Sequence, residues 1–155
     1  MSWLATIRPD DWNLALLLHV LGAFVMVGAL VAAASFLYAA RRDGSLALTR
    51  LGFRSLLIAA LPALIVTRVA AQWLASEEGL EDSDATWITV GYMSTDPGLL
   101  FLLAATVAAG LAVRRANGAE AGGDAGRGVT LAAGLVTVLI AVYAVVIWIM
   151  ATKPG

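Results

Sequence analysis

Four long apolar stretches, separated by shorter polar segments, dominate the chain. They run over Trp12–Tyr38, Ser55–Ala75, Pro97–Val113 and Val129–Met150. A membrane-spanning helix needs about 20 predominantly apolar residues, and only helices and closed barrels satisfy their backbone polar groups in lipid. Since the stretches lack the alternation of apolar and polar residues that barrel strands show, the pattern predicts an all-α membrane protein. We expect a four-helix bundle forming one transmembrane domain over residues 1–155.

The polar segments between these stretches predict where the helices begin and end. Asp43–Gly44 indicates a turn, after which Ser45–Arg54 is expected to extend the second helix into the headgroup region. Asp96–Pro97 combines a good N-cap residue with a proline for the first turn, so it predicts the start of the third helix. The glycine-rich segment Ala116–Gly128 predicts a flexible loop before the fourth helix.

Three local features refine this picture. Pro62 should kink the second helix and free a carbonyl near Ile58. In the acidic loop expected over Ser76–Asp96, the stretch Trp87–Met93 is apolar enough to lie on the membrane surface or fold over the bundle. The basic residues follow the first apolar stretch rather than precede it, so we expect a retained helix and not a signal peptide.

Basic residues are distributed unevenly along the chain. Seven arginines lie in the connections after the first and third stretches, whereas Arg8 and Lys153 lie near the termini. The seven are Arg41, Arg42, Arg50, Arg54, Arg114, Arg115 and Arg127. The positive-inside rule therefore predicts that both basic connections are cytoplasmic and that both termini lie on the outer face.

Composition agrees with a membrane protein and excludes several functions. Hydrophobic residues make up 61% of the 155 residues and charged residues 14%, against about 45–50% and about 25% in soluble domains. This composition excludes a disordered chain and a basic nucleic-acid-binding protein. With no cysteine and one histidine, thiol catalysis, iron–sulfur clusters and multi-histidine metal sites within one chain are excluded as well. No Asp or Glu falls within the four stretches, which argues against a carboxylate-driven transporter.

A few polar side chains inside the stretches are the candidates for function. His19 and Arg68 each lie about 10 Å from the outer end of their helix, at 1.5 Å per residue. Tyr143 reaches the same layer on the fourth helix, and Thr67 and Gln72 add hydrogen-bonding groups nearby. A buried arginine costs about 2.5–3.5 kcal/mol on insertion scales, so it normally faces the bundle interior and has a partner. These five residues are our predicted ligand-binding site.

Simpler interpretations remain open for the same residues. Arg68 could snorkel to the outer headgroups, and His19 could be a hydrogen bond between helices. The small-residue pairs beginning at Gly28, Ala104 and Ala133 indicate helix packing, within the bundle or between copies of the chain.

The opening of the first helix resembles known membrane families. Leu18-His19-Val20-Leu21-Gly22-Ala23, followed by Gly28, is similar to the LHxxGAxxxxG start of small bacterial four-helix membrane proteins of uncharacterised function. It also resembles the first helix of CopD-type copper-resistance domains and of HemJ-type protoporphyrinogen oxidases. In the HemJ family this histidine is associated with haem, so the resemblance implies that His19 is a haem axial ligand. It also implies a bacterial inner (cytoplasmic) membrane.

These observations together favour binding over bond-making chemistry. We expect a multi-pass protein, homo-oligomeric or part of a larger membrane complex, with an outer-leaflet polar pocket around His19 and Arg68. The ligand could be a b-type haem held by His19 with Arg68 on a propionate, or another anionic molecule. The alternatives are a structural or assembly subunit of a larger complex and a small anion channel or carrier.

Overall fold

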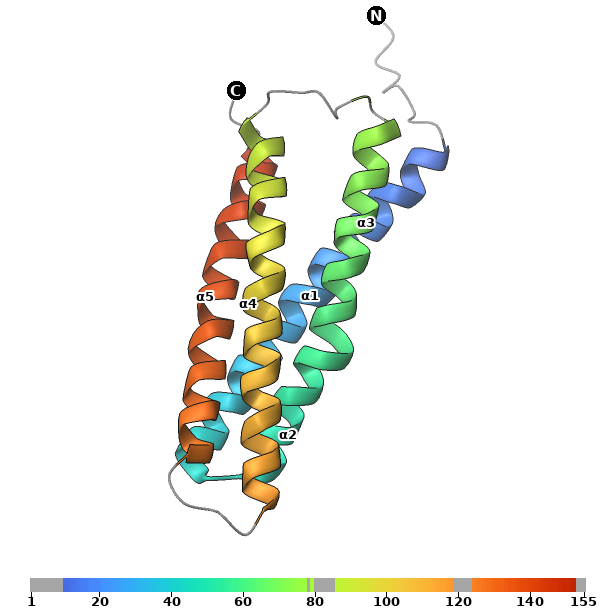
Figure 1. Cartoon of the computed structure of the whole chain (residues 1–155). Coiled ribbons are helices and arrows are strands. Elements are labelled where there is room, and N and C mark those ends of the chain that lie inside the picture. The colour runs from blue at the N-terminus through green and yellow to red at the C-terminus, as the bar shows by residue number, and fades with distance from the viewer. Residues whose placement is uncertain (1–9, 78, 80–85, 119–123, 153–155) are drawn as a thin grey trace, which may run out of the picture.

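A computed structural model describes residues 10–77, 79, 86–118 and 124–152, which form four long helical spans packed side by side (Figure 1). In chain order the elements are α1 (Asp10–Asp43), α2 (Leu46–Arg54), the π-helical segment η1 (Ser55–Ala60), α3 (Leu61–Glu77), α4 (Thr86–Asn117) and α5 (Asp124–Thr152). Because α2, η1 and α3 follow one another without a break, they form one span. The predicted all-α, four-helix fold is therefore confirmed.

The four spans are long and apolar enough to cross a membrane. They cover Leu14–Asp43, Leu46–Glu77, Ile88–Asn117 and Gly126–Thr152. Large apolar side chains also cover the outside of the bundle, where Phe24 is 73% and Leu100 69% exposed. Helices that are apolar all round are typical of a lipid environment, so the structure agrees with a multi-pass membrane protein.

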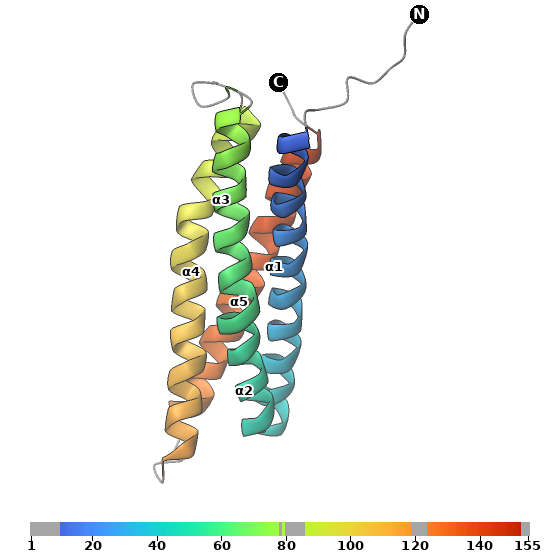
Figure 2. The same ribbon diagram turned by 90° about the vertical axis from the view of Figure 1, so that its right-hand side faces the viewer.

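The bundle has two ends of different construction. We call the end where α1 begins and α5 finishes the terminal end, and the opposite end, with the α1–α2 and α4–α5 connections, the loop end. In Figure 1 the α1/α3 pair and the α4/α5 pair lie close together at the loop end and diverge towards the terminal end. Figure 2 shows α3 between α4 and α1 in the perpendicular view. The two pairs therefore lie farther apart at the terminal end than at the loop end.

Close packing at the loop half of the bundle depends on small residues. A Cβ atom on Gly128 of α5 would lie 3.1 Å from both the Ala108 carbonyl oxygen and the Ala112 Cβ of α4. A Cβ on Gly110 of α4 would lie 3.0 Å from the Phe53 ring of α2. Small residues therefore let α4 approach both neighbouring spans, as close helix packing in membranes requires.

The predicted turn after the first span is confirmed. Gly44 adopts a positive φ of 64°, a conformation that glycine accepts without steric cost. Ser45 then caps α2, because its hydroxyl accepts a hydrogen bond from the Leu48 amide at 3.4 Å. As predicted, residues 46–54 continue into the second span.

The irregularity near Pro62 is a π-helical segment rather than a simple kink. η1 ends two residues before Pro62, and its wider i→i+5 hydrogen bonding accommodates the turn before a proline that lacks a donor. The Ser55 hydroxyl, at the start of η1, donates to the Ala29 carbonyl of α1 at 2.9 Å. This contact ties the irregular segment to the neighbouring span.

The predicted start of the third span is wrong. α4 begins at Thr86 and passes straight through Pro97, so Trp87–Met93 forms its first turns and is neither a surface segment nor a lid. A membrane helix tolerates a proline where its surroundings compensate the missing N–H. In the turn before Pro97 the hydroxyls of Ser94 and Thr95 both donate to the Gly91 carbonyl, at 3.0 and 2.7 Å, whereas the carbonyl that the proline leaves without a helical donor is that of Met93. The remainder of the predicted acidic loop, residues 78 and 80–85, lies outside the described residues.

The other boundaries extend beyond the predictions. The first span runs over Asp10–Asp43 instead of Trp12–Tyr38. The predicted loop Ala116–Gly128 is shorter, because α4 continues to Asn117 and α5 begins at Asp124. Apolar stretches mark the part of a helix that fits the hydrocarbon, and polar turns can continue the helix on either side.

Candidate functional site

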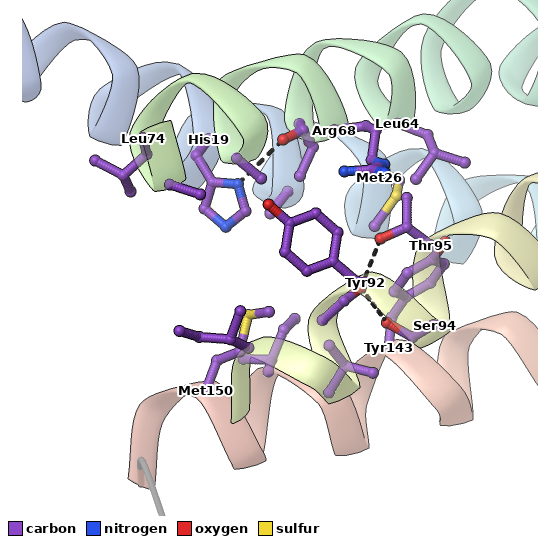
Figure 3. A pocket seen from close by; sticks show the side chains of 18 residues that line it. His19, Met26, Leu64, Arg68, Leu74, Tyr92, Ser94, Thr95, Tyr143 and Met150 are labelled. Carbon is purple, nitrogen blue, oxygen red and sulfur yellow. Dashed lines mark hydrogen bonds between the residues drawn. The ribbon is translucent and has the colours of Figure 1, made fainter. Parts of the chain in front are cut away.

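A cavity of about 180 Å³ lies between the two helix pairs at the terminal end. Side chains from all four spans line it, and most of them are apolar (Figure 3). Its polar side chains are His19, Thr67, Arg68, Tyr92, Ser94, Thr95 and Tyr143. Four of the five predicted site residues are among them, so the divergence of the helix pairs brings these residues together.

The orientation of His19 is fixed from α3. Its Nδ1 lies 3.1 Å from the Thr67 carbonyl oxygen, which can only accept a hydrogen bond, so Nδ1 carries the proton. The other ring nitrogen, Nε2, remains available on the cavity side (Figure 3). This arrangement is common for a histidine that contacts a ligand, because the hydrogen bond of one nitrogen fixes the ring orientation and the other nitrogen contacts the ligand.

Gly22 makes the His19 contact possible. It lies one helical turn after His19, and a Cβ at this position would lie 2.5 Å from the Thr67 hydroxyl and 3.3 Å from the Ala63 carbonyl oxygen. The Thr67 hydroxyl itself donates to that Ala63 carbonyl at 2.7 Å. The side chain of Thr67 therefore stabilises α3, while its backbone carbonyl holds the imidazole.

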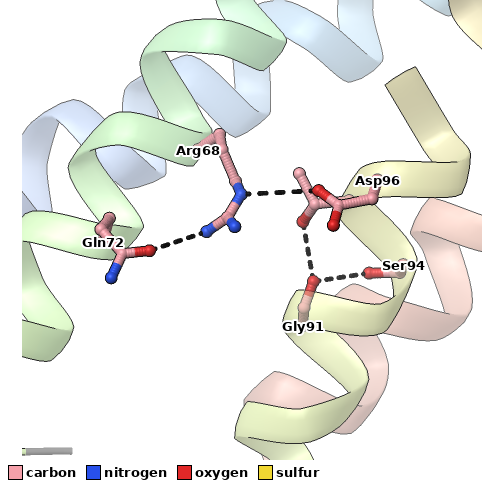
Figure 4. Close-up of polar contacts among 6 residues, drawn as sticks. Arg68, Gln72, Gly91, Ser94 and Asp96 are labelled. Carbon is pink, nitrogen blue, oxygen red and sulfur yellow. Dashed lines mark hydrogen bonds and ion pairs between the residues drawn. The ribbon is translucent and has the colours of Figure 1, made fainter. Parts of the chain in front are cut away.

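Arg68 lies next along α3 and points towards α4 (Figure 4). Its Nη1 donates to the Gln72 Oε1 at 3.1 Å, and its Nε lies 3.9 Å from the Asp96 Oδ1. The guanidinium carbon also lies 4.8 Å from the centroid of the Tyr92 ring, within the range of a cation–π contact. Arg68 is thus engaged across the gap between α3 and α4, and its side chain is 33% exposed.

Tyr143 contributes a buried hydroxyl without a partner. The residue is 6% exposed, and its hydroxyl has no hydrogen-bond partner among the described residues. Gly98 of α4 provides the space, because a Cβ there would overlap the Tyr143 hydroxyl. A buried hydroxyl without a partner costs about 1–3 kcal/mol, and this hydroxyl is enclosed against Gly98 rather than open to the cavity, which the Tyr143 ring lines.

Gln72 differs from the other predicted residues. It is exposed on α3 and does not line the cavity, but it accepts the hydrogen bond from Arg68. Its role is therefore to orient the guanidinium.

Sequence reasoning missed Tyr92 and Asp96. Both belong to the stretch that was predicted to be loop, and Asp96 falls inside the span Ile88–Asn117. Asp96 therefore belongs to a candidate span by length and composition, although it lies outside the predicted apolar stretch. The missed signal is the apolar character of residues 87–93, which allows the helix to begin before the proline.

The fit of a haem to this cavity is incomplete. His19 presents a suitable nitrogen, and Met26 also lines the cavity. The cavity volume of about 180 Å³ is nevertheless smaller than the roughly 300 Å³ at which pockets for drug-sized ligands begin, and a porphyrin is larger still. The donor atom suits haem, but the space does not.

Comparisons with known proteins do not assign this site. No protein-family model matches the chain, and neither a curated protein nor a solved structure matches it. The functional argument therefore rests on the geometry of the chain itself.

Proposed function

We propose that this chain is a multi-pass protein of a bacterial inner membrane that binds a small, largely apolar molecule carrying an anionic group. The observation that carries the proposal is the convergence of His19, Arg68 and Tyr143, from three different spans, on one mostly apolar cavity. Ligand sites typically combine an apolar lining with a few converging polar groups. The arginine-rich loop end favours a cytoplasmic position for that end, which puts the cavity in the outer leaflet.

The chemistry of the lining supports this class of ligand. Arg68 offers guanidinium donors that suit a carboxylate, sulfonate or phosphate. The volume of about 180 Å³ is close to that of an apolar cavity of about 150 Å³ that holds benzene. The part of the ligand inside the cavity is therefore about one ring or a short alkyl chain.

His19 determines how binding responds to protons. With Nδ1 bonded to Thr67, a neutral imidazole presents an acceptor to the cavity, whereas a protonated imidazole presents a donor. An anionic ligand is therefore bound more tightly when the imidazole is protonated. A metal or haem iron requires the unprotonated nitrogen, so its binding weakens as the pH falls.

A binding role agrees better with the core than conduction does. Leu30, Leu102 and Leu139, each near the middle of its helix, are at most 1% exposed. They fill the bundle between its two ends, which favours a closed site over a pore lined by Arg68.

A role as an assembly subunit has one observation in its favour. Gly28 is exposed on α1, and a Cβ built there meets nothing within 4 Å. Such a surface would allow close packing with a second chain, a copy or a partner, in the membrane. Purification that always brings a stoichiometric partner chain would support this function instead.

The test uses hexanesulfonate, whose charge does not change with pH, and hexanol as its neutral counterpart. Titrated into the purified full chain in neutral detergent, hexanesulfonate should bind saturably and more tightly than hexanol. Arg68→Gln should weaken hexanesulfonate binding about 10- to 100-fold, since a hydrogen bond to a charged group contributes about 1.5–3 kcal/mol. Hexanol binding should change little.

Arg54→Gln is the matched control, because it removes an exposed arginine from the loop half of the bundle. Equal losses in both variants, or equal affinity for hexanol and hexanesulfonate, would contradict the proposal. A Soret band after haem supplementation, lost in His19→Gln, would support the haem form of the site.

A further inference from the structure

A second cavity, of about 680 Å³, lies at the loop end, opposite the site described above. The end of α1, the start of α2, the end of α4 and the start of α5 line it. Its volume falls within the range of about 300–1,000 Å³ that is usual for ligand pockets. Two arginines, Arg41 and Arg127, are among the residues that line it.

The donors around this cavity suit an anion. The guanidinium groups of Arg41 and Arg127 match the geometry of phosphate oxygens. Gly126 lines the cavity in the first turn of α5, where backbone N–H groups lack partners within the helix and the helix dipole is positive. The Thr130 hydroxyl adds a neutral donor. Arg127 makes another interaction within the chain, but a guanidinium has five donors and can serve more than one partner.

The apolar surroundings favour a lipid over a soluble anion. Leu131 lines the cavity and is 58% exposed, and Val138 and Val145, seven and fourteen residues further along α5, are 49% and 57% exposed. Residues seven apart lie on one face of a helix. An apolar track therefore leads from the cavity along α5 in the direction that an acyl chain takes from its head group.

We propose that the loop-end cavity binds the phosphate of an anionic phospholipid, with Arg41 and Arg127 as its charged contacts. Basic pockets between transmembrane helices on the cytoplasmic side are a recognised form of lipid head-group site. The proposal does not depend on the ligand of the terminal-end cavity.

The experiment measures lipid binding to the purified full chain in neutral detergent by native mass spectrometry. The probes are phosphatidylglycerol, phosphatidylcholine and inorganic phosphate. The test variant is Arg41→Gln/Arg127→Gln. The control is Arg42→Gln/Arg114→Gln, which removes the same charge from the same end at exposed arginines that do not line the cavity.

We expect one saturable phosphatidylglycerol site that prefers this lipid over phosphatidylcholine. The test variant should raise the Kd for phosphatidylglycerol about 10- to 100-fold, as expected from losing charge-assisted hydrogen bonds. The control variant should remain within about twofold of the wild type. Arg41→Lys/Arg127→Lys keeps the charge but loses the planar guanidinium. Its Kd for phosphatidylglycerol should therefore lie between those of the glutamine test variant and the control variant. This lysine variant also tests the site if the glutamine variant folds poorly.

Three results would overturn the proposal. Equal losses in the test and control variants would show general attraction to a basic surface. Inorganic phosphate that competes at the affinity of the lipid would make this a site for a soluble anion. Absence of saturable phosphatidylglycerol binding to the wild type would exclude the site.

Discussion

In the loop half of the bundle α4 approaches α5 and α2 closely through glycine and alanine, beside the cavity that opens at that end, whereas at the terminal end polar side chains bridge helix pairs that lie apart. Gly128 meets Ala108 and Ala112 at the first end, and Arg68 reaches Tyr92 and Asp96 across the gap at the second. In lipid, close packing is the main source of helix association. We infer that the loop end provides most of the stability and that the terminal end can exchange its polar contacts for those of a ligand.

The largest expected effect concerns stability at the loop end. Gly128→Leu should destabilise the fold by about 1–3 kcal/mol, because the new side chain has to displace the α4 backbone at Ala108. The free energy of unfolding in mixed micelles measures this change. Gly28→Leu is the control, since nothing lies within 4 Å of a Cβ at that position, and it should be neutral or slightly stabilising. A similar loss of unfolding free energy in both variants would contradict the inference that close packing at the loop end stabilises the fold.

The next effect tests the terminal end through pH. Hexanesulfonate binding should tighten about tenfold as the pH is lowered, because a protonated His19 presents a donor to the anion. His19→Gln should remove this dependence, and equilibrium titration of both proteins at several pH values measures it. A wild-type affinity that does not vary with pH would exclude a proton-coupled role for His19, and weaker binding at low pH would favour a metal or haem ligand.

Tyr143→Phe should separate stability from binding. The substitution removes a buried hydroxyl that has no partner among the described residues, so the ligand-free protein should gain about 1 kcal/mol. The same change should leave hexanesulfonate binding within about twofold, because the hydroxyl is enclosed against Gly98 and the ring that lines the cavity is kept. Tyr38→Phe is the control, because the Tyr38 hydroxyl bonds the Thr137 hydroxyl at 3.0 Å, and its loss should not stabilise the protein. Weaker stability in Tyr143→Phe would indicate a hydrogen bond that the structure does not contain.

The parts of the fold that the sequence predicts are those that the bilayer determines. A hydrocarbon core of about 30 Å requires long apolar stretches, so the number of spans follows from composition and length. The depth of His19 and Arg68 follows from the same arithmetic, and the structure places His19 beside Thr67, the residue before Arg68. Whether these side chains bind a ligand remains a prediction.

The start of α4 could not be predicted because two rules compete there. Asp96 followed by Pro97 is a good helix start in water, but a membrane span can continue through a proline, as α4 does at Pro97. Because of this error Tyr92 and Asp96 were not predicted as site residues. A residue assigned to a loop has no predicted depth in the membrane and no predicted helix face. The contacts of Arg68 with Tyr92 and Asp96 also depend on the distance between the two helix pairs at the terminal end. The hydropathy of the sequence does not determine that distance.

Asp96 provides the smallest and most selective test of the terminal end. Its side chain is 80% exposed and lies 3.9 Å from Arg68, so Asp96→Asn should change stability by less than about 0.5 kcal/mol. Because Asp96 competes with an anionic ligand for the same guanidinium, the variant should bind hexanesulfonate about two- to threefold more tightly at low salt, with the difference decreasing as salt screens the pair. Asp43→Asn, which removes an exposed carboxylate at the loop end, should leave the affinity unchanged. Tighter binding in both variants would reflect net charge alone, whereas tighter binding in Asp96→Asn only would identify Arg68 as the residue that exchanges an internal partner for the ligand.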